Sequence, residues 1–501
     1  MGQYLLSLDN GGTYIKAAIF DQEGTQLGLA RKYNQVLEPR PGWSEYDLEV
    51  LWKTNCCCIK EVFQKTGIAP EQIAAIGIAG QGSGVYAIDS EGKPVRNAIS
   101  SADRRAQPQT DRWERDGTGK RLYPYIYRET FPGHTNAILA WMKEREPENY
   151  HRIYRLFAMK DFLVYKLTGN AISGYGCLSA SGLMNIAEKT FDPMLAESFG
   201  IPEMVDKFGP SYWDIEVCGT VTQETAAECG CAVETPVSAG LHDVSAAALA
   251  MGLTDSKSCF IITGTHGING YVSSAPVLDG TVKYNELFAF PGKFLLEEGY
   301  PSSTATLEWV ISVLFVDEKS AMPEIYEQIN KEVEQVEPTE SELVFLPFLR
   351  GNRDNGRAAG TWIGLRPEHT KAHMLRAVYE GVVFSHILQM EYMFANRKRP
   401  EKICMAGGAV NSSVWVQMFA DAFGISIEIV PGEEMGAKGA AIAAATAIKL
   451  YPDIYTAVAE MTNSRVTVCP RPEYREIYRE KLTRFRRVNQ ALDGCWPEFS
   501  K

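Results

Sequence analysis

The sequence predicts an α/β protein made of two domains with similar topology. Short apolar strands alternate with segments of helical spacing, a β-meander opens the chain, and a similar glycine hairpin returns roughly halfway along. The chain has 501 residues. Because domains usually contain ~100 to 200 residues, a chain of this length should fold around more than one core.

The first half begins with three predicted strands, over residues 4–9, 13–20 and 26–33. Asn10-Gly11-Gly12 separates the first two strands. Asn-Gly is the dipeptide that a type I′ turn favours, because both central residues need positive φ. Further along, helical spacing covers 48–66 and 136–146, and short strands cover 73–78 and 85–88.

The second half repeats the hairpin pattern. A strand over 258–263 leads into the turn Gly264-Thr265-His266-Gly267 and then into a strand over 268–272. A strand at 235–240 and an Ala-rich helix at 244–251 precede it, so we place the domains at 1–242 and 243–501. The pattern then predicts strands at 402–405 and 425–430 and helices at 413–423 and 436–450.

Composition and charge exclude several classes of protein. Hydrophobic residues make up 45% and charged residues 22%, which is typical of a globular chain. The net charge of −12 has the wrong sign for nucleic-acid binding through overall charge. The 11 cysteines lack metal-ligand spacing, so we expect reduced thiols. No apolar run approaches ~18 residues, so the prediction is a soluble, cytoplasmic protein without a membrane span.

The first hairpin is a candidate phosphate and metal site. Asp9 is a carboxylate at a strand end, Gly11 and Gly12 offer backbone amides that an anion can approach, and Thr13 adds a hydroxyl. Lys16 is a possible phosphate contact three residues later. The alternative is a plain hairpin turn with an Asx-type aspartate and a solvated lysine.

Two turns in the second half could hold the same phosphate chain from the other side. Gly264-Thr265 repeats the glycine hairpin, and a pair of such hairpins is a stronger indication than either alone. Gly407-Gly408 follows a strand and precedes a helix with Ser412 or Ser413 near its N-cap, a position that favours a nucleotide. An ordinary strand-to-helix turn is the alternative for Gly407-Gly408.

Asp243 lies between a predicted strand and a predicted helix, and two roles fit it. It is either the helix N-cap or a general base kept ionised by the helix N-terminus. The glycine-rich loop Gln81-Gly82-Ser83-Gly84 and the cluster at residues 100–105 follow strands, where polyhydroxylated ligands often bind, although both could be plain surface loops. The sequence has neither a G-x-S-x-G elbow nor a P-loop.

Taken in order, a set of motifs between about residue 3 and about residue 450 resembles the FGGY carbohydrate kinase family. The set comprises Leu8-Asp9-Asn10-Gly11-Gly12-Thr13, Gly80-Gln81, Ser101-Ala102-Asp103-Arg104-Arg105, Lys160-Asp161-Phe162-Leu163, Leu167-Thr168-Gly169, Asp243, Gly264-Thr265, Leu346-Pro347-Phe348-Leu349, Arg357, Gly360, Glu380-Gly381 and Gly407-Gly408. Within the family, the L-xylulose kinase branch is the most similar. The stretches that indicate this branch are Gln81-Gly82-Ser83-Gly84, Ser100 to Ala106, Leu122-Tyr123-Pro124, Gly133-His134 and Tyr379 to His386.

The resemblance implies two actin-like, RNase-H-like domains on either side of a deep catalytic cleft. It implies ATP-dependent phosphorylation of a sugar hydroxyl with Mg²⁺, the sugar bound mainly by the first domain and the nucleotide mainly by the second. By position, Asp243 matches the family's general base and Asp9 matches the acidic residue that binds the metal. Thr13 and Thr265 match the hydroxyls that face the phosphates, and Gly407 and Gly408 match the turn beside the adenosine. Gln81 and Asp103 lie where the family contacts the sugar.

The residues around the expected sugar depart from the D-xylulose kinase pattern. Where those kinases carry Met-His and Trp-Asn, this chain has Gly82-Ser83 and Ser101-Ala102, and Val244 stands where many members have Asn or Gln. We therefore expect a ketose kinase with L-xylulose as the leading substrate. The alternatives are D-xylulose, L-ribulose, erythritol and 3-keto-L-gulonate, or an actin-like ATPase or sugar sensor without phosphotransfer. The expected partners are the sugar and ATP or ADP, with a homodimer as the assembly considered.

Overall fold

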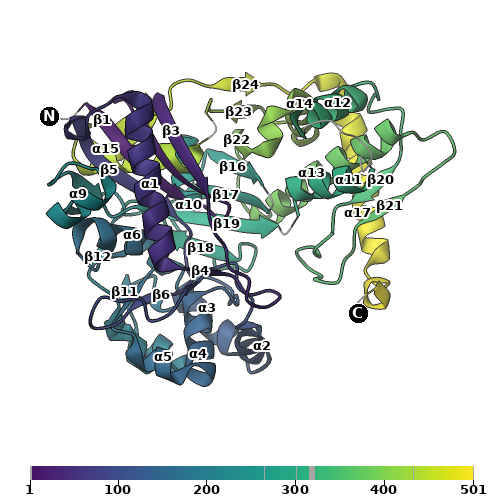
Figure 1. Ribbon diagram of the computed structural model, residues 1–501. Helices are drawn as coiled ribbons and strands as arrows, with labels where there is room; N and C mark the ends of the chain where they lie inside the picture. Colours follow the sequence, from purple (N-terminus) through teal and green to yellow (C-terminus); the bar gives the residue numbers. More distant parts are fainter. Residues whose placement is uncertain (1–2, 265, 301, 315–321, 433, 500–501) are drawn as a thin grey trace.

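The computed structural model describes residues 3–264, 266–300, 302–314, 322–432 and 434–499 and contains two seven-stranded mixed sheets (Figure 1). The first sheet has the order β13-β14-β5-β1-β2-β3, with β15 also paired to β5. Its strands are β1 (Tyr4–Asn10), β2 (Tyr14–Phe20), β3 (Gln26–Tyr33), β5 (Ile73–Gly80), β13 (Val217–Thr220), β14 (Pro236–Ser238) and β15 (Leu241–His242).

The second sheet repeats this topology with the order β18-β19-β17-β16-β22-β23-β24. Its strands are β16 (Ser258–Thr263), β17 (Gly267–Ser273), β18 (Tyr284–Leu287), β19 (Phe294–Tyr300), β22 (Lys402–Gly407), β23 (Ile427–Ile429) and β24 (Val466–Val468). In each sheet an antiparallel meander is followed by a strand that runs parallel to the first strand of the meander, β5 beside β1 and β22 beside β16. The predicted internal repeat is therefore confirmed.

The connection between β1 and β2 differs from the predicted turn. Asn10 belongs to β1 and pairs with Ile15, the backbone N–H of Gly11 donates to the carbonyl of Tyr14 (3.1 Å), and neither glycine of the turn has a positive φ. The amide side chain of Asn10 exchanges two hydrogen bonds, 2.9 and 3.0 Å, with Asn55. The prediction of a type I′ turn at Asn10-Gly11 is wrong, because this buried amide pair keeps Asn10 in the strand.

Helix α1 (Leu48–Thr66) covers one face of the first sheet and has the predicted bounds. Asp47 caps its N-terminus by accepting from two backbone amides, and Gly67 ends it in the left-handed conformation. A mostly helical region with its own apolar core extends from this sheet, below it in Figure 1. Its core is formed by α2 (Gln107–Arg115), α3 (Thr118–Ile126), α4 (Thr135–Arg145), α5 (Pro147–Arg152), α8 (Pro193–Ser198), β6 (Tyr86–Ile88), β7 (Ala98–Ile99) and β8 (Arg155–Phe157). Helices α6 (Met159–Thr168) and α9 (Gln223–Cys229) pack instead with α1 in the core of the first sheet. The remaining short elements of this half are α7 (Tyr175–Ser179), β4 (Glu45–Tyr46), β9 (Ser173–Gly174), β10 (Met184–Asn185), β11 (Thr190–Phe191) and β12 (Ser211–Tyr212).

Two Ala-rich helices join the halves of the molecule. Helix α15 (Met435–Ala447) packs against α10 (Asp243–Ala250) and against β1 and β5 of the first sheet. The approach is close, since a Cβ on Gly439 would lie 2.0 Å from the carbonyl oxygen of Ala246 and one on Gly77 would lie 2.0 Å from that of Ala440. The same apolar core contains Leu5 of the first sheet and Phe260 of the second. The sites at the ends of both sheets are thus held by one continuous core.

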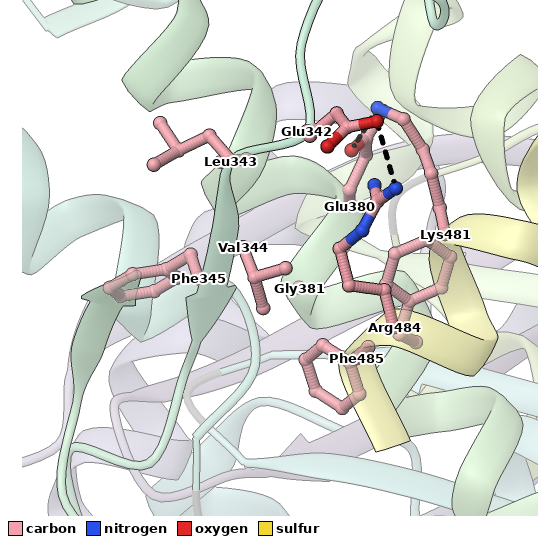
Figure 2. A pocket seen from close by; sticks show the side chains of 11 residues that line it. Glu342, Leu343, Val344, Phe345, Glu380, Gly381, Lys481, Arg484 and Phe485 are labelled. Atoms are coloured by element: carbon pink, nitrogen blue, oxygen red, sulfur yellow. Dashed lines mark hydrogen bonds and ion pairs between the residues drawn. The ribbon is translucent and has the colours of Figure 1, made fainter. Parts of the chain in front are cut away.

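The second half also carries a helical layer, on the right in Figure 1. It contains α11 (Thr304–Leu314), α12 (Met322–Glu334), α13 (Lys371–Met393), α14 (Ser413–Phe423), α17 (Arg475–Leu492), β20 (Val344–Leu346) and β21 (Thr361–Ile363). Helix α16 (Ile454–Met461) instead packs against α15 and α10. Figure 2 shows how the C-terminal helix α17 is fixed: the Lys481 ammonium bonds both carboxylate oxygens of Glu380 on α13, at 2.8 and 2.7 Å. A buried pair of this kind costs ~3 to 5 kcal/mol when one partner is removed, so it locks α17 in place.

None of the helices in the described part of the chain is long and apolar enough to cross a membrane.

Candidate active site

The candidate catalytic residues meet where three parallel strands end. β5 runs parallel to both β1 and β15, with Gly80 opposite Asn10 and opposite His242. Because the carboxyl ends of parallel strands share one edge of a sheet, Asp9, Gln81 and Asp243 come together there, as in other open α/β sheets that bind ligands. Three motifs that are spread over more than 200 residues of the sequence thus meet at one sheet edge.

Asp9 lies in a buried cluster of charges. Its carboxylate is 3.3 Å from the Lys16 ammonium, which also pairs with Glu434 at the start of α15. Burial raises the pKa of Asp9 to about 6, with further increases from the negative charges of Asp243 and Glu434 and an opposing decrease from Lys16. A carboxylate with a raised pKa and like charges around it favours an additional cation. A Cβ on Gly436 would lie 2.7 Å from the Asp9 carboxylate, so only glycine leaves room for it at this position.

The donor set around Asp9 fits a hard divalent cation such as Mg²⁺. Carboxylate oxygens are its usual protein ligands, and it commonly keeps several waters and phosphate oxygens as well. Among the described residues there is no group of three or more His, Cys, Asp or Glu side chains arranged to hold a metal. The residues present thus fit a cation that would bind through the Asp9 carboxylate and complete its shell with water and phosphate oxygens.

Asp243 is the first residue of α10, and its carboxylate is accessible. Its Oδ1 accepts from the backbone N–H of Val244 (2.8 Å), and 36% of the side chain is exposed. His242, not Asp243, holds the N-cap position of the helix. The positive end of the helix dipole favours the ionised carboxylate, which is the form a general base needs.

The loop after β5 contains one polar atom, on Gln81, without a hydrogen-bond partner among the described residues, and two residues, Gly82 and Ser83, that face the interior. Gln81 has a buried Oε1 without a hydrogen-bond partner in the described chain, a group that a ligand hydroxyl would satisfy. Ser83 has a φ of 61° and donates its hydroxyl to the carbonyl of Ala180 (2.8 Å), so this hydroxyl holds the loop in place. Gly82 faces His242: a Cβ there would lie 2.8 Å from the imidazole ring.

Asp103 is fully buried and its carboxylate is occupied. It accepts from the backbone N–H of Ser44 (2.6 Å) and from the guanidinium of Arg105 (2.8 and 2.9 Å). The neighbouring Arg104 is exposed instead, with its guanidinium 4.6 Å from the centre of the Phe131 ring. Asp103 thus shapes this loop from inside, and Arg104 is the side chain that the loop presents outward.

The candidate nucleotide turns also lie side by side. β16 and β22 are parallel neighbours with Thr263 opposite Gly407, so the Gly264 hairpin and the Gly407-Gly408 turn share one sheet edge. Gly407 has a φ of 95°, and a Cβ there would lie 2.1 Å from the Thr263 carbonyl oxygen. Gly408 is exposed, with no atom nearer than 3.6 Å to an added Cβ. Its bare backbone is thus accessible to a phosphate or nucleoside.

The remaining predicted contacts have mixed outcomes. Ser412 caps α14 as expected, accepting from the backbone N–H of Trp415 (3.2 Å) and donating to Asn330 (2.7 Å). Thr13 is exposed at the hairpin tip, and Lys16 is held by Asp9 and Glu434. Thr265 lies outside the described residues.

Sequence reasoning missed three charged residues that border the site, Arg128, Glu286 and Glu434. None lies in a motif, and each reaches the site from an element far from it in the sequence. No local pattern marks them, because their role depends on how the two halves pack.

Two family models cover most of the chain. The N-terminal domain of the FGGY family of carbohydrate kinases matches residues 4–250, and the C-terminal domain of that family matches residues 259–448. The chain therefore belongs to the FGGY family of carbohydrate kinases, and it is a sugar phosphotransferase.

Individual relatives match along nearly their whole length. The chain is 34% identical to an L-xylulose/3-keto-L-gulonate kinase of Escherichia coli (strain K12) over 99% of this chain and 98% of the relative. It is 34% identical to a probable L-xylulose kinase of Pasteurella multocida, over 98% and 99% of the two chains. A gluconate kinase structure from Lactobacillus acidophilus has the same fold, with a TM-score of 0.91, 21% identity and 99% coverage of each chain.

Proposed function

We propose that the enzyme transfers the γ-phosphate of ATP to a terminal hydroxyl of a ketose, with L-xylulose, converted to L-xylulose 5-phosphate, as the leading substrate. The observation that carries the proposal is the accessible Asp243 carboxylate at the same sheet edge as Asp9 and as Gln81, whose Oε1 has no hydrogen-bond partner among the described residues. An acid pair beside an open polar group matches the need to accept a proton and to neutralise phosphate charge.

In this mechanism Asp243 accepts the proton of the sugar hydroxyl as its oxygen attacks the γ-phosphorus in line with the leaving ADP. The amides around Gly12, Gly264 and Gly408 and the hydroxyls of Thr13 and Thr265 would orient the phosphates. Lys16 would act by holding Asp9 in place rather than by direct phosphate contact, since two carboxylates already engage it. Asp9 would hold Mg²⁺, which when bound neutralises charge on the phosphate oxygens.

We assign the sugar to residues 1–242 and the nucleotide to residues 243–501. On the sugar side, Gln81 would bind a hydroxyl, Gly82 would make room for the His242 ring beside it, Ser83 would hold the loop in place, and Asp103 would set the loop that presents Arg104. On the nucleotide side, Gly407, Gly408 and the start of α14 at Ser412 would receive the adenosine. The names of the two relatives that are 34% identical support a ketose or keto sugar acid.

A coupled ADP-release assay across L-xylulose, D-xylulose, L-ribulose, erythritol, 3-keto-L-gulonate and glycerol tests the substrate. We expect L-xylulose to give the highest kcat/KM, with ratios on the order of 10² over its epimers, since a misplaced hydroxyl leaves a buried partner unpaired. If D-xylulose or glycerol is preferred, the L-xylulose assignment is wrong although the kinase activity stands.

Product analysis separates phosphotransfer from the other activities of this fold. An ATPase or a sugar sensor would release phosphate or bind sugar without forming a phosphosugar, whereas the proposed reaction yields one sugar phosphate per ADP. Mass spectrometry of the reaction mixture measures this ratio. We further propose that the enzyme works in the cytoplasm and that it forms a homodimer. Light scattering of the purified chain tests the homodimer.

A further inference from the structure

A continuous row of charged side chains leads from Arg128 through Glu286 and His242 to the candidate base Asp243. The Nε2 of His242 is 3.1 Å from Oδ1 of Asp243, and its Nδ1 is 2.8 Å from Oε2 of Glu286. The other oxygen of Glu286 accepts from the guanidinium of Arg128 (2.9 Å). Arg128 follows α3 in the first half and Glu286 lies on β18 in the second half, so this array crosses between the halves to reach Asp243.

The array is buried and its charges match. Glu286 and Arg128 are 1% and 3% exposed, and the His242 side chain is 12% exposed. Burial alone would lower the pKa of His242, but the negative charges of Glu286 and Asp243 outweigh it and raise that pKa well above the usual value. An imidazolium with both nitrogens donating fits between the two carboxylates.

Two further carboxyls interact with His242, Asp214 from the segment before β13 and Glu297 from β19. Burial raises the pKa of Asp214 to about 7 and that of Glu297 to about 8, the latter helped by the charge of Glu286. Around neutral pH, Glu297 is therefore largely protonated and Asp214 is partly ionised. By contrast, the positive charges of His242 and Arg128 lower the pKa of Glu286 to about 2 in spite of its burial, so Glu286 faces the ring fully charged.

The position of the ring depends on a glycine in the sugar loop. A Cβ on Gly82 would lie 2.8 and 2.9 Å from Cδ2 and Nε2 of His242, closer than side chains approach. Gly82 therefore leaves the room that the imidazole fills. The unusual Gly82 of the sequence and the histidine before the base form one structural unit.

We propose that His242 is the positioning residue of the reaction, holding the Asp243 carboxylate in its productive orientation through an anchor that Glu286 and Arg128 supply from both halves of the molecule. The inference rests on the proposed role of Asp243 as the base. If this is so, the orientation of the Asp243 carboxylate depends on the contact between Arg128 of the first half and Glu286 of the second half. A change in that contact would then also change the orientation of the base.

Paired substitutions separate the two hydrogen bonds of His242. In H242N, the side-chain amide can replace the Nδ1 donor toward Glu286, but no donor remains toward Asp243. In H242Q, the longer side chain can place its amide near the position of Nε2 and so keep a donor toward Asp243. We expect H242N to lower kcat by ~10 to 10²-fold, because small errors in orientation are costly. KM for sugar and ATP should stay within about threefold, and H242Q should recover much of the lost kcat.

Two more variants test the geometry without relying on one position. G82A should lower kcat in the same way by displacing the ring, and E286Q should lower it by weakening the anchor. H151N, an exposed histidine on α5, is the matched control and should match wild type. Circular dichroism and thermal melts identify any variant that has lost its fold, and kcat is compared among the folded ones.

The outcomes distinguish this inference from the function on which it rests. If D243N is inactive while folded H242N and G82A both keep kcat within twofold of wild type, His242 has no positioning role and the inference is overturned. If D243N itself retains wild-type kcat, Asp243 is not the base and the proposed mechanism falls first. A KM increase without a kcat decrease in H242N would assign the histidine to sugar binding and also overturn the inference.

Discussion

The two glycine hairpins occupy equivalent places in the repeated fold but differ in what surrounds them. The first, between β1 and β2, lies beside Asp9, Lys16 and Glu434 and is supported by the neutral amide pair of Asn10 and Asn55. The second, between β16 and β17, has no carboxylate at the corresponding position: Ile262, opposite Ala406 on β22, takes the place that Asp9, opposite Ala79 on β5, has in the first sheet. In the proposed mechanism, the repeated fold therefore separates two tasks, with charge chemistry at the first hairpin and phosphate binding by backbone amides at the second.

The supports of the hairpins differ as well. Beneath the second hairpin, the buried His386 bonds Asn269 (2.7 Å) and Ser303 (3.1 Å), and a Cβ on Gly267 would lie 2.7 Å from its ring. Burial lowers the pKa of His386 to about 3, so it is neutral in the folded protein. The second hairpin therefore depends on a titratable residue where the first depends on amides that do not titrate.

The largest loss of turnover is expected at the charged side, from D243N. Asn keeps the size of the side chain but cannot accept the proton, so kcat should fall by ~10² or more with sugar binding preserved. Steady-state kinetics measure this, and D243A thermal melts measure what the carboxylate adds to helix stability as an acidic residue in the first turn of α10, ~0.3 to 1 kcal/mol. A folded D243N enzyme with near-wild-type kcat contradicts the assignment of the base.

A smaller but metal-specific loss is expected from D9A. Removing this carboxylate should lower turnover by on the order of tenfold at limiting Mg²⁺ and raise the Mg²⁺ concentration for half-maximal rate, with little change in sugar KM. A Mg²⁺ titration of wild type and D9A measures the shift. An unchanged titration curve would leave the first hairpin as a structural turn and remove the difference between the hairpins.

A binding effect alone is expected at the glycine side, from G408A. The added Cβ meets no atom closer than 3.6 Å, so stability should change little, but it covers backbone that a nucleotide would approach. KM for ATP should rise by on the order of tenfold, equivalent to about 1.4 kcal/mol, with kcat nearly unchanged. G494A, which adds a Cβ in open space, is the matched control. If G408A lowers kcat instead of raising the KM for ATP, the glycine turn takes part in the chemical step and the contrast between the two hairpins is wrong.

The smallest effect on turnover is expected from H386Q, which changes the acid stability instead. The unfolded chain binds a proton at this histidine below about pH 6.5, while the folded chain does not until about pH 3. Stability is therefore fully present above pH 6.5 and falls as the pH decreases below it, by about 1.4 kcal/mol per pH unit per proton.

Thermal midpoints of wild type and H386Q between pH 5 and pH 7.5, at about half-unit steps, measure this dependence. H386Q should show a shallower decline on the acidic side than wild type, whatever its absolute stability. If the curves of wild type and H386Q are parallel, His386 does not make the second hairpin sensitive to acid.

Local patterns predicted the elements that local forces determine. Helix α1 has its predicted bounds because an aspartate cap, an apolar face and a terminal glycine all lie within it or beside it. Strands β3 and β16 and helix α14 also have the predicted bounds. The turn after Asn10 could not be predicted from its dipeptide, because a partner on α1 decides its conformation.

The candidate site was predictable only where its residues lie in motifs. Asp9, Gln81 and Asp243 follow strands and could be proposed from the sequence, and the parallel register then explains how they meet. Glu286 and Arg128 become visible only once the halves are packed together. The buried carboxylate of Asp103 illustrates the same limit, since its occupation by Arg105 and Ser44 depends on side-chain direction.

The interface of α10 with α15 has a mechanical consequence. Its buried surface consists almost entirely of alanines and glycines, with backbone meeting backbone at Gly439 and Ala246. Alanine and glycine side chains lose no rotamer entropy when they are buried, so the two helices pack closely without the entropy cost that leucine or phenylalanine would carry. The distance between the halves is therefore set by backbone geometry, and a larger side chain at Gly439 would have to push α10 and α15 apart.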